Sequence, residues 1–210
     1  MIKYKVKEVR SNVIAVVVPD DYERAMLFWR VQEFYESPCD RFRGSAFSVW
    51  DYARWYARKY GGCFSYPRDF VGFNLPLIVA KKCYEMNPVE TPYDEEMKSL
   101  VDSLFVNGER KYLIGAESLK SSTFDHEMAH ALYYTDDSYR NDMDEVTAGL
   151  SKPALSAFRK NLAKIGYCRQ VFKDEVQAYM STEISPKLCR GVRGKKSIHR
   201  RYRAIFKSYR

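Results

Sequence analysis

The chain has 210 residues, of which 46% are hydrophobic and 15% aromatic, with only 10 Gly and 8 Pro. This composition excludes a disordered or low-complexity chain and is sufficient for one well-cored domain. The formal net charge of +8 is unevenly distributed, because the first 183 residues hold 25 basic and 27 acidic residues, whereas the remainder holds ten basic residues and no acidic one. We therefore expect one domain over residues 1–183 and a basic C-terminal helix or tail over residues 184–210.

The N-terminal segment alternates charged and apolar residues and lacks the apolar core and cleavage site of a secretory signal. Its apolar run NVIAVVV is too short to span a bilayer. The five cysteines are odd in number and form no CxxC pair; they are Cys39, Cys63, Cys83, Cys168 and Cys189. These features predict a cytoplasmic protein with free thiols and no transmembrane segment, with secretion as an effector as the alternative.

The first half of the chain alternates between strand and helix patterns. Residues 4–9 and 12–18 predict a strand pair with a turn between them. Apolar residues at helical spacing predict helices over residues 21–36 and 46–60, the second ending at Gly61 and Gly62. Residues 70–83 begin as a loop and become an apolar stretch of undecided type, residues 92–106 predict a helix, and residues 111–118 predict a short strand.

The next segment, STFDHEMAHALYYTDD, contains two of the three histidines of the chain, His126 and His130, with Glu127 directly after the first. Ser121, Ser122 or Thr123 can cap a helix that runs through both histidines. Side chains four residues apart project from the same face of a helix and can hold one cation, while Glu127 lies about 100 degrees around the helix. Random placement of the chain's His and Glu residues would give this pattern on the order of 0.003 times per chain. The pattern therefore predicts a metal site.

His126-Glu127-Met128-Ala129-His130 resembles the active-site helix of the zincin metallopeptidases. The resemblance covers only residues 121–183. It implies an α+β fold of the zincin kind, with a small mixed N-terminal sheet with helices and a mainly helical C-terminal half. It also implies a zinc ion (Zn²⁺) as the cofactor, bound by both histidines and by a third residue from elsewhere in the chain.

Two branches of the zincins suggest different third ligands. In metzincins the ligand follows the first histidine by ten positions, where this chain has Asp136, but the glycine that usually turns the chain out of the helix is Tyr133 here. Gluzincins take a glutamate from a later helix, and Glu175 lies in a predicted helix with an apolar face. A buried carboxylate needs a partner, so zinc would explain its position. Glu175 is favoured, in a pattern nearest to the lethal-factor-like and ImmA-like groups, with Asp136 and the neighbouring Asp174 as alternatives.

The thermolysin-like acid expected four residues after that glutamate is here Tyr179, so the partner that orients the histidines is left open between Asp174 and Asp144. The resemblance implies a zinc metalloendopeptidase that hydrolyses a peptide bond of a polypeptide by attack of a zinc-bound water activated by Glu127. Tyr167 and Tyr179 are the candidates for stabilising the oxyanion.

By resemblance to zincins, an extended substrate is expected to add to an exposed strand edge near the active-site helix, with residues 111–118 as the candidate strand.

The basic C-terminal segment has Ile198, Tyr202, Ile205, Phe206 and Tyr209 at helix-like intervals among its cations. This spacing predicts a helix that packs its apolar side on the domain. The cations also suggest a nucleic acid or an anionic surface as a partner, whereas His199 is a poor candidate for a zinc ligand in this setting. The alternative function is therefore a nucleic-acid-binding or effector protein whose zinc site is structural or inactive.

Overall fold

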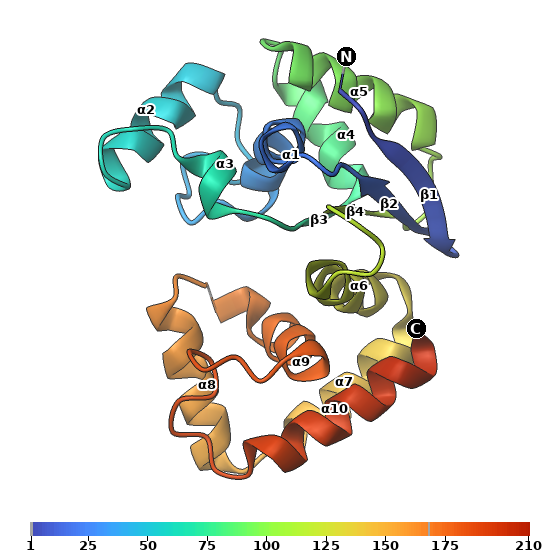
Figure 1. The fold of residues 1–210 in the computed structure, drawn as a ribbon, viewed down its shortest axis with the longest axis vertical. Coiled ribbons are helices and arrows are strands. Elements are labelled where there is room, and N and C mark those ends of the chain that lie inside the picture. The colour runs from blue at the N-terminus through green and yellow to red at the C-terminus, as the bar shows by residue number, and fades with distance from the viewer. Residues whose placement is uncertain (1, 168) are drawn as a thin grey trace. The chain divides into compact units, whose positions relative to one another are not determined.

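The computed structural model describes residues 2–167 and 169–210, which form a four-stranded mixed sheet and mostly helices (Figure 1). The predicted α+β class with a small mixed sheet is confirmed. The chain packs as two compact units, Met1–Phe124 and Asp125–Arg210. Within the described ranges, no helix has the length and apolar character needed to cross a membrane.

The sheet belongs to the first unit and has the strand order β1-β2-β4-β3. Strands β1 (Lys5–Arg10) and β2 (Val13–Val17) form the predicted antiparallel pair, joined by a turn in which Asn12 has a φ of 65°. Asparagine is one of the few residues that adopt this left-handed conformation readily. Strand β4 (Tyr112–Ala116) pairs parallel with β2, and β3 (Phe73–Pro76) pairs antiparallel with β4.

The expectation that residues 111–118 offer an exposed edge to a substrate is wrong. Strand β4 lies inside the sheet and is hydrogen-bonded on both sides, by β2 and by β3. Its five residues are all buried. Because the backbone groups of β4 are already paired within the sheet, they cannot accept an added strand.

Three of the helices in the first unit were predicted from the sequence, and their starts have a common cause. Helices α1 (Asp21–Glu36), α2 (Val49–Lys59) and α5 (Pro92–Leu104) each begin after a residue whose side chain accepts a hydrogen bond from a backbone N–H of the first turn; these capping residues are Asp20, Ser48 and Thr91. The undecided stretch over residues 70–83 contains β3 and the start of α4 (Leu77–Met86), and the short α3 (Tyr66–Asp69) was not predicted.

Helix α1 packs closely on the sheet because of a glycine in β4. A Cβ atom at Gly115 would lie 2.7 Å from Cε2 of Phe28, which is fully buried on α1. The Phe28 ring is itself stacked on Phe73 of β3, with 5.4 Å between ring centroids. The ring therefore has little room to move aside, and Gly115 sets the distance between helix and sheet.

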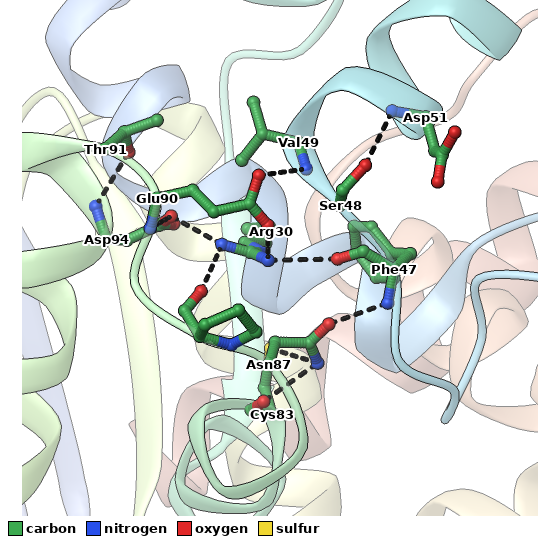
Figure 2. A network of polar contacts seen from close by, with 11 residues as sticks. Arg30, Phe47, Ser48, Val49, Asp51, Cys83, Asn87, Glu90, Thr91 and Asp94 are labelled. Atoms are coloured by element: carbon green, nitrogen blue, oxygen red, sulfur yellow. Dashed lines mark hydrogen bonds and ion pairs between the residues drawn. The ribbon is translucent and has the colours of Figure 1, made fainter.

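Arg30, fully buried on α1, links this helix to two loops (Figure 2). Its guanidinium donates to Oδ2 of Asp94 in the first turn of α5 (2.5 Å), a helix that spans Pro92–Leu104. It also donates to Oε1 of Glu90 (2.8 Å) and the carbonyl of Pro88 (2.9 Å) in the loop after α4, and to the carbonyl of Phe47 (2.9 Å) before α2. The loop positions are fixed further by Asn87, whose Oδ1 accepts from the backbone N–H of Phe47 (2.7 Å). Two carboxylates and two backbone carbonyls thus compensate a charge that would otherwise be costly to bury.

A second buried charge-bearing group, Glu33, lies one turn further along α1. It is 4% exposed and packs among aromatic side chains that include Tyr52 and Tyr66. Burial raises the pKa of the Glu33 carboxyl, and the nearby hydroxyl groups of Tyr52 and Tyr66 offset only part of this effect. The interior of the first unit therefore favours the protonated form.

The second unit contains only helical elements in its described part. They are α6 (Ser122–Thr135, which begins at the end of the first unit), α7 (Asp137–Ala148), α8 (Lys152–Lys164), the 3₁₀ turn η1 (Arg169–Val171), α9 (Phe172–Thr182) and α10 (Lys195–Tyr209). Helix α10 packs on α7 and α9 (Figure 1). The basic C-terminal segment is thus largely helical and contacts the rest of the unit through its apolar side, as predicted.

The cysteines make no disulfide among the described residues, in which Cys39, Cys63, Cys83 and Cys189 are free thiols. Cys168 lies outside the described residues.

We predict that Gly115→Ala lowers the free energy of unfolding by about 1–3 kcal/mol, because the added methyl group must displace the packed Phe28 ring. Urea denaturation followed by circular dichroism measures this, because both units contain helices and the method therefore reports the unfolding of each. Gly149→Ala is the matched control, because Gly149 has an ordinary φ of −77° and a Cβ there would have its nearest neighbour at 3.5 Å. Equal effects of the two substitutions would contradict the steric argument.

We also predict that Glu33 makes the first unit less stable as the pH rises. The pKa of Glu33 is higher in the folded protein than in the unfolded chain. Its contribution to the free energy of unfolding is therefore complete below the unfolded glutamate pKa of about 4.3, and it is lost as the pH rises through the folded-state pKa. Glu33→Gln should therefore gain stability relative to the wild type between pH 4 and pH 8, measured by urea denaturation at each pH. Glu85→Gln, an exposed change on α4, should leave the pH dependence unaltered.

Candidate metal centre

Helix α6 presents both histidines of the motif on one side. The helix begins after Ser121, whose Oγ accepts a hydrogen bond from the backbone N–H of Phe124 (3.0 Å), so Ser121 is the capping residue among the three candidates. His126 and His130 follow one turn apart, and their Nε2 atoms are 3.3 Å from each other. Two ligands of a tetrahedral zinc ion at about 2.0–2.1 Å are separated by roughly 3.3–3.4 Å, so this spacing suits a shared ion.

Helix α9 brings Glu175 to the same point. Its carboxylate is buried, with Oε1 3.8 Å from Nε2 of His130. One ligand atom from each of His126, His130 and Glu175 lies within 4.8 Å of the other two. Among the residues that the structure describes, these three side chains are the His, Cys, Asp or Glu group whose positions suit a metal ion. Two imidazole nitrogens and one carboxylate oxygen are a donor set typical of zinc.

The two alternative ligands have other contacts. Asp136 is the N-terminal capping residue of α7, where its Oδ1 accepts from the backbone N–H of Tyr139 (3.0 Å). Asp174 accepts a hydrogen bond at Oδ1 from Nδ1 of His130 (2.8 Å), on the side of the ring away from Nε2. Asp174 is therefore placed as a partner that orients His130, and Asp144 instead contacts Tyr133 (2.6 Å) and Lys173 (2.7 Å).

A buried amide joins the helices around this cluster. Gln177, on α9, has no exposed surface, and its Nε2 donates to the carbonyl of Ala129 on α6 (3.1 Å) and to Oδ1 of Asp174 (2.9 Å). Its Oε1 accepts from the hydroxyl of Tyr139 on α7 (2.8 Å). One side chain thus fixes α9 against α6 and α7 and also holds the acid that orients His130.

His126 has a weaker contact on the outer side of its ring. Its Nδ1 lies 3.5 Å from Oγ1 of Thr182, whose hydroxyl donates to the carbonyl of Ala178 (2.8 Å). The ring of Tyr179 lies edge-on to the ring of His126, with 4.6 Å between centroids. The two histidines are therefore held differently, His130 by a carboxylate and His126 by a hydroxyl and an aromatic ring.

The surroundings move the pKa values of the two histidines in opposite directions. Burial and the neighbouring His130 lower the pKa of His126 to about 3, so this imidazole is neutral. Burial also lowers the pKa of His130, but the carboxylates of Asp174, Glu175 and Glu127 outweigh it and raise the pKa of His130 above its usual value. In the metal-free protein the cluster therefore holds a proton on His130, and a divalent cation would compete with that proton.

The remaining predicted residues lie around the same cluster. Glu127 is 6% exposed on α6, and its charge contributes to raising the pKa values of the Tyr167 and Tyr179 hydroxyls, after the larger effect of burial. The hydroxyl oxygens of Tyr167 and Tyr179 are 3.3 Å apart. The two oxyanion candidates are half-buried, whereas Glu127 and Glu175 are buried, and the charges of both glutamates act on the two tyrosine hydroxyls.

Sequence reasoning missed Gln177 and Thr182. The signal for Gln177 was present, because it is a polar residue between Val176 and Ala178 in an apolar helix face and three residues after Asp174. A polar side chain in such a position needs a buried hydrogen-bond partner. No comparable signal marks Thr182, which lies at the end of α9.

We predict that Asp174→Ala lowers zinc affinity about 10–100-fold, because His130 loses the acceptor that orients its ring. Asp174→Asn should recover part of the loss, since an amide oxygen can still accept from Nδ1. Competition with a chromogenic chelator measures the affinity. Asp144→Ala is the control, because it removes a carboxylate that bonds Tyr133 and Lys173 instead of a histidine. If the Asp144→Ala and Asp174→Ala variants had equal zinc affinities, Asp174 would not be the residue that orients His130.

Comparison with known proteins gives this cluster no assigned role. No protein-family model, curated protein or solved structure matches the chain. The chemistry of the site therefore has to be inferred from its own side chains.

Proposed function

We propose that the protein is a zinc-dependent metallopeptidase of the gluzincin type, with His126, His130 and Glu175 as metal ligands. The observation that carries the proposal is the convergence of these three donors, while Glu127 follows the first ligand directly on the same helix. A structural zinc site usually has four protein ligands and contains cysteine, whereas three ligands of this type leave a position for water or substrate.

The residues around the three proposed ligands also suit a zinc site. The proposed ligand His130 donates its other ring nitrogen to Asp174, and this carboxylate–histidine arrangement is common at zinc sites. The low pKa of His126 leaves its imidazole neutral, whereas zinc binding would have to release the proton that the neighbouring carboxylates favour on His130. A bound cation would compensate the cost of burying the Glu175 carboxylate.

When bound, zinc would supply Lewis acidity to a substrate carbonyl and to water. Glu127 accepts a proton from the attacking water, whose oxygen forms a bond to the carbonyl carbon. Glu127 then donates that proton to the nitrogen as the C–N bond breaks, so that a carboxylic acid and an amine are released. The hydroxyls of Tyr167 and Tyr179 are the nearest identified donors for the oxyanion, and their raised pKa values keep them protonated at neutral pH.

We predict that Glu127→Gln lowers the rate of peptide hydrolysis at least about a hundredfold while zinc remains bound, because the amide cannot accept the proton. Mass spectrometry of a broad peptide library measures cleavage, and elemental analysis of the purified protein measures zinc. A catalytically active Glu127→Gln variant would reject Glu127 as the base. Stoichiometric zinc with no cleavage by the wild type in this library would instead support a structural or inactive site.

The ligand assignment has its own test. Glu175→Gln should reduce zinc affinity at least about a hundredfold, since it removes a charged ligand. Glu183→Gln is the matched control, because Glu183 follows α9 directly and is exposed. Normal zinc affinity in Glu175→Gln would show that the third ligand is a different residue.

A further inference from the structure

The strongest charge asymmetry of the protein lies outside the proposed active site. Ten basic residues and no acidic residue follow Glu183, and most of the cations belong to α10. The rest of the chain has a small negative net charge. The excess of positive charge therefore belongs to the C-terminal segment of the second unit.

The apolar side of α10 is occupied by its contacts with α7 and α9 (Figure 1). Tyr202 and Phe206 are buried there, and the hydroxyls of Tyr202 and Thr147 lie 2.8 Å apart. Nδ1 of His199 donates to the carbonyl of Met180 on α9 (2.8 Å). These contacts fix the rotation of α10, so the opposite side of the helix is held towards solvent.

Four cations form a single row on the exposed side: Lys196, Arg200, Arg203 and Lys207. This spacing of four, three and four residues keeps them on one side of the helix over roughly 16 Å. We call these four residues the basic row. All four are exposed, and none forms an ion pair with a described residue, whereas Arg210 just after α10 pairs with Asp125.

The chemistry of the basic row indicates its partner. Four like charges on a rigid helix repel each other, and a ligand with repeated negative charges, such as a phosphate backbone, relieves this repulsion and releases its own counterions. A membrane-binding helix would insert its apolar side, but that side of α10 is covered by α7 and α9. Single-stranded nucleic acid is usually held by exposed aromatic rings, and Tyr202 and Phe206 are buried. A regular duplex requires only a straight series of cations.

We propose that the basic row binds the phosphate backbone of double-stranded nucleic acid, without reading its sequence. This interaction uses no residue of the metal cluster and is independent of the peptidase proposal.

The test measures binding of the full-length chain to a fluorescent 20-base-pair DNA duplex by anisotropy, with EDTA present so that zinc plays no part. With four phosphate contacts, the wild-type affinity should fall roughly a hundredfold between 50 and 200 mM salt. Changing the basic row to glutamine at all four positions should weaken binding at 100 mM salt at least tenfold. It should also reduce the slope of log affinity against log salt by about 4.

A control variant removes the same charge elsewhere. Lys3, Lys5, Lys7 and Lys82 are exposed cations of the first unit, and their change to glutamine should leave the slope within about one unit of the wild type. Circular dichroism checks that both variants are folded. Equal losses in the two variants would overturn the proposal, as would tighter binding of single-stranded DNA or of phosphatidylserine vesicles than of the duplex.

Discussion

The candidate metal centre depends on the side-chain amide of Gln177. Three helices meet at this group, because it bonds the backbone of α6, a tyrosine of α7 and the acid before Glu175 on its own helix. A buried amide has few positions in which all its donors and acceptors are satisfied. Its hydrogen bonds therefore determine how α9 is rotated and how far it lies along α6. That placement in turn brings Glu175 to the two histidines, although Gln177 itself is not among the proposed ligands.

The first unit is organised by a different kind of buried polar group. Arg30 carries a full charge into the interior and gathers the loops before α2 and after α4 around it (Figure 2). Removing one partner of such a network leaves the other charge buried, so these groups favour one arrangement of the loops over its alternatives. In both units, then, apolar packing supplies the stability while a few polar side chains determine how the elements fit together.

The sequence predicted the parts of the structure that depend on local patterns. Two strand-like segments on either side of a turn predicted β1 and β2, and helical spacing predicted α1 and α2. The capping residue and acidic first turn predicted α5. It did not predict that β3 would pair with β4, because strand order depends on contacts between distant segments. The edge role expected for residues 111–118 failed for that reason.

The candidate site divides in the same way. His126, Glu127 and His130 were identified by spacing within one helix, which is a local property. Glu175 required the resemblance to a peptidase family, since 45 positions separate it from His130. The choice between Asp174 and Asp144 as the partner of His130 could not be made from the sequence, because it depends on how α7 and α9 pack against α6.

The parallel pairing of β2 with β4 has a consequence for synthesis of the chain. Val13 of β2 pairs with Tyr112 of β4. Nearly a hundred residues are therefore synthesised after β2 before β4 is available to pair with it. During that interval, VIAVV is an apolar strand with one unpaired edge, which is the kind of segment that aggregates. The second edge of β2 is therefore left unpaired until β4 has been made.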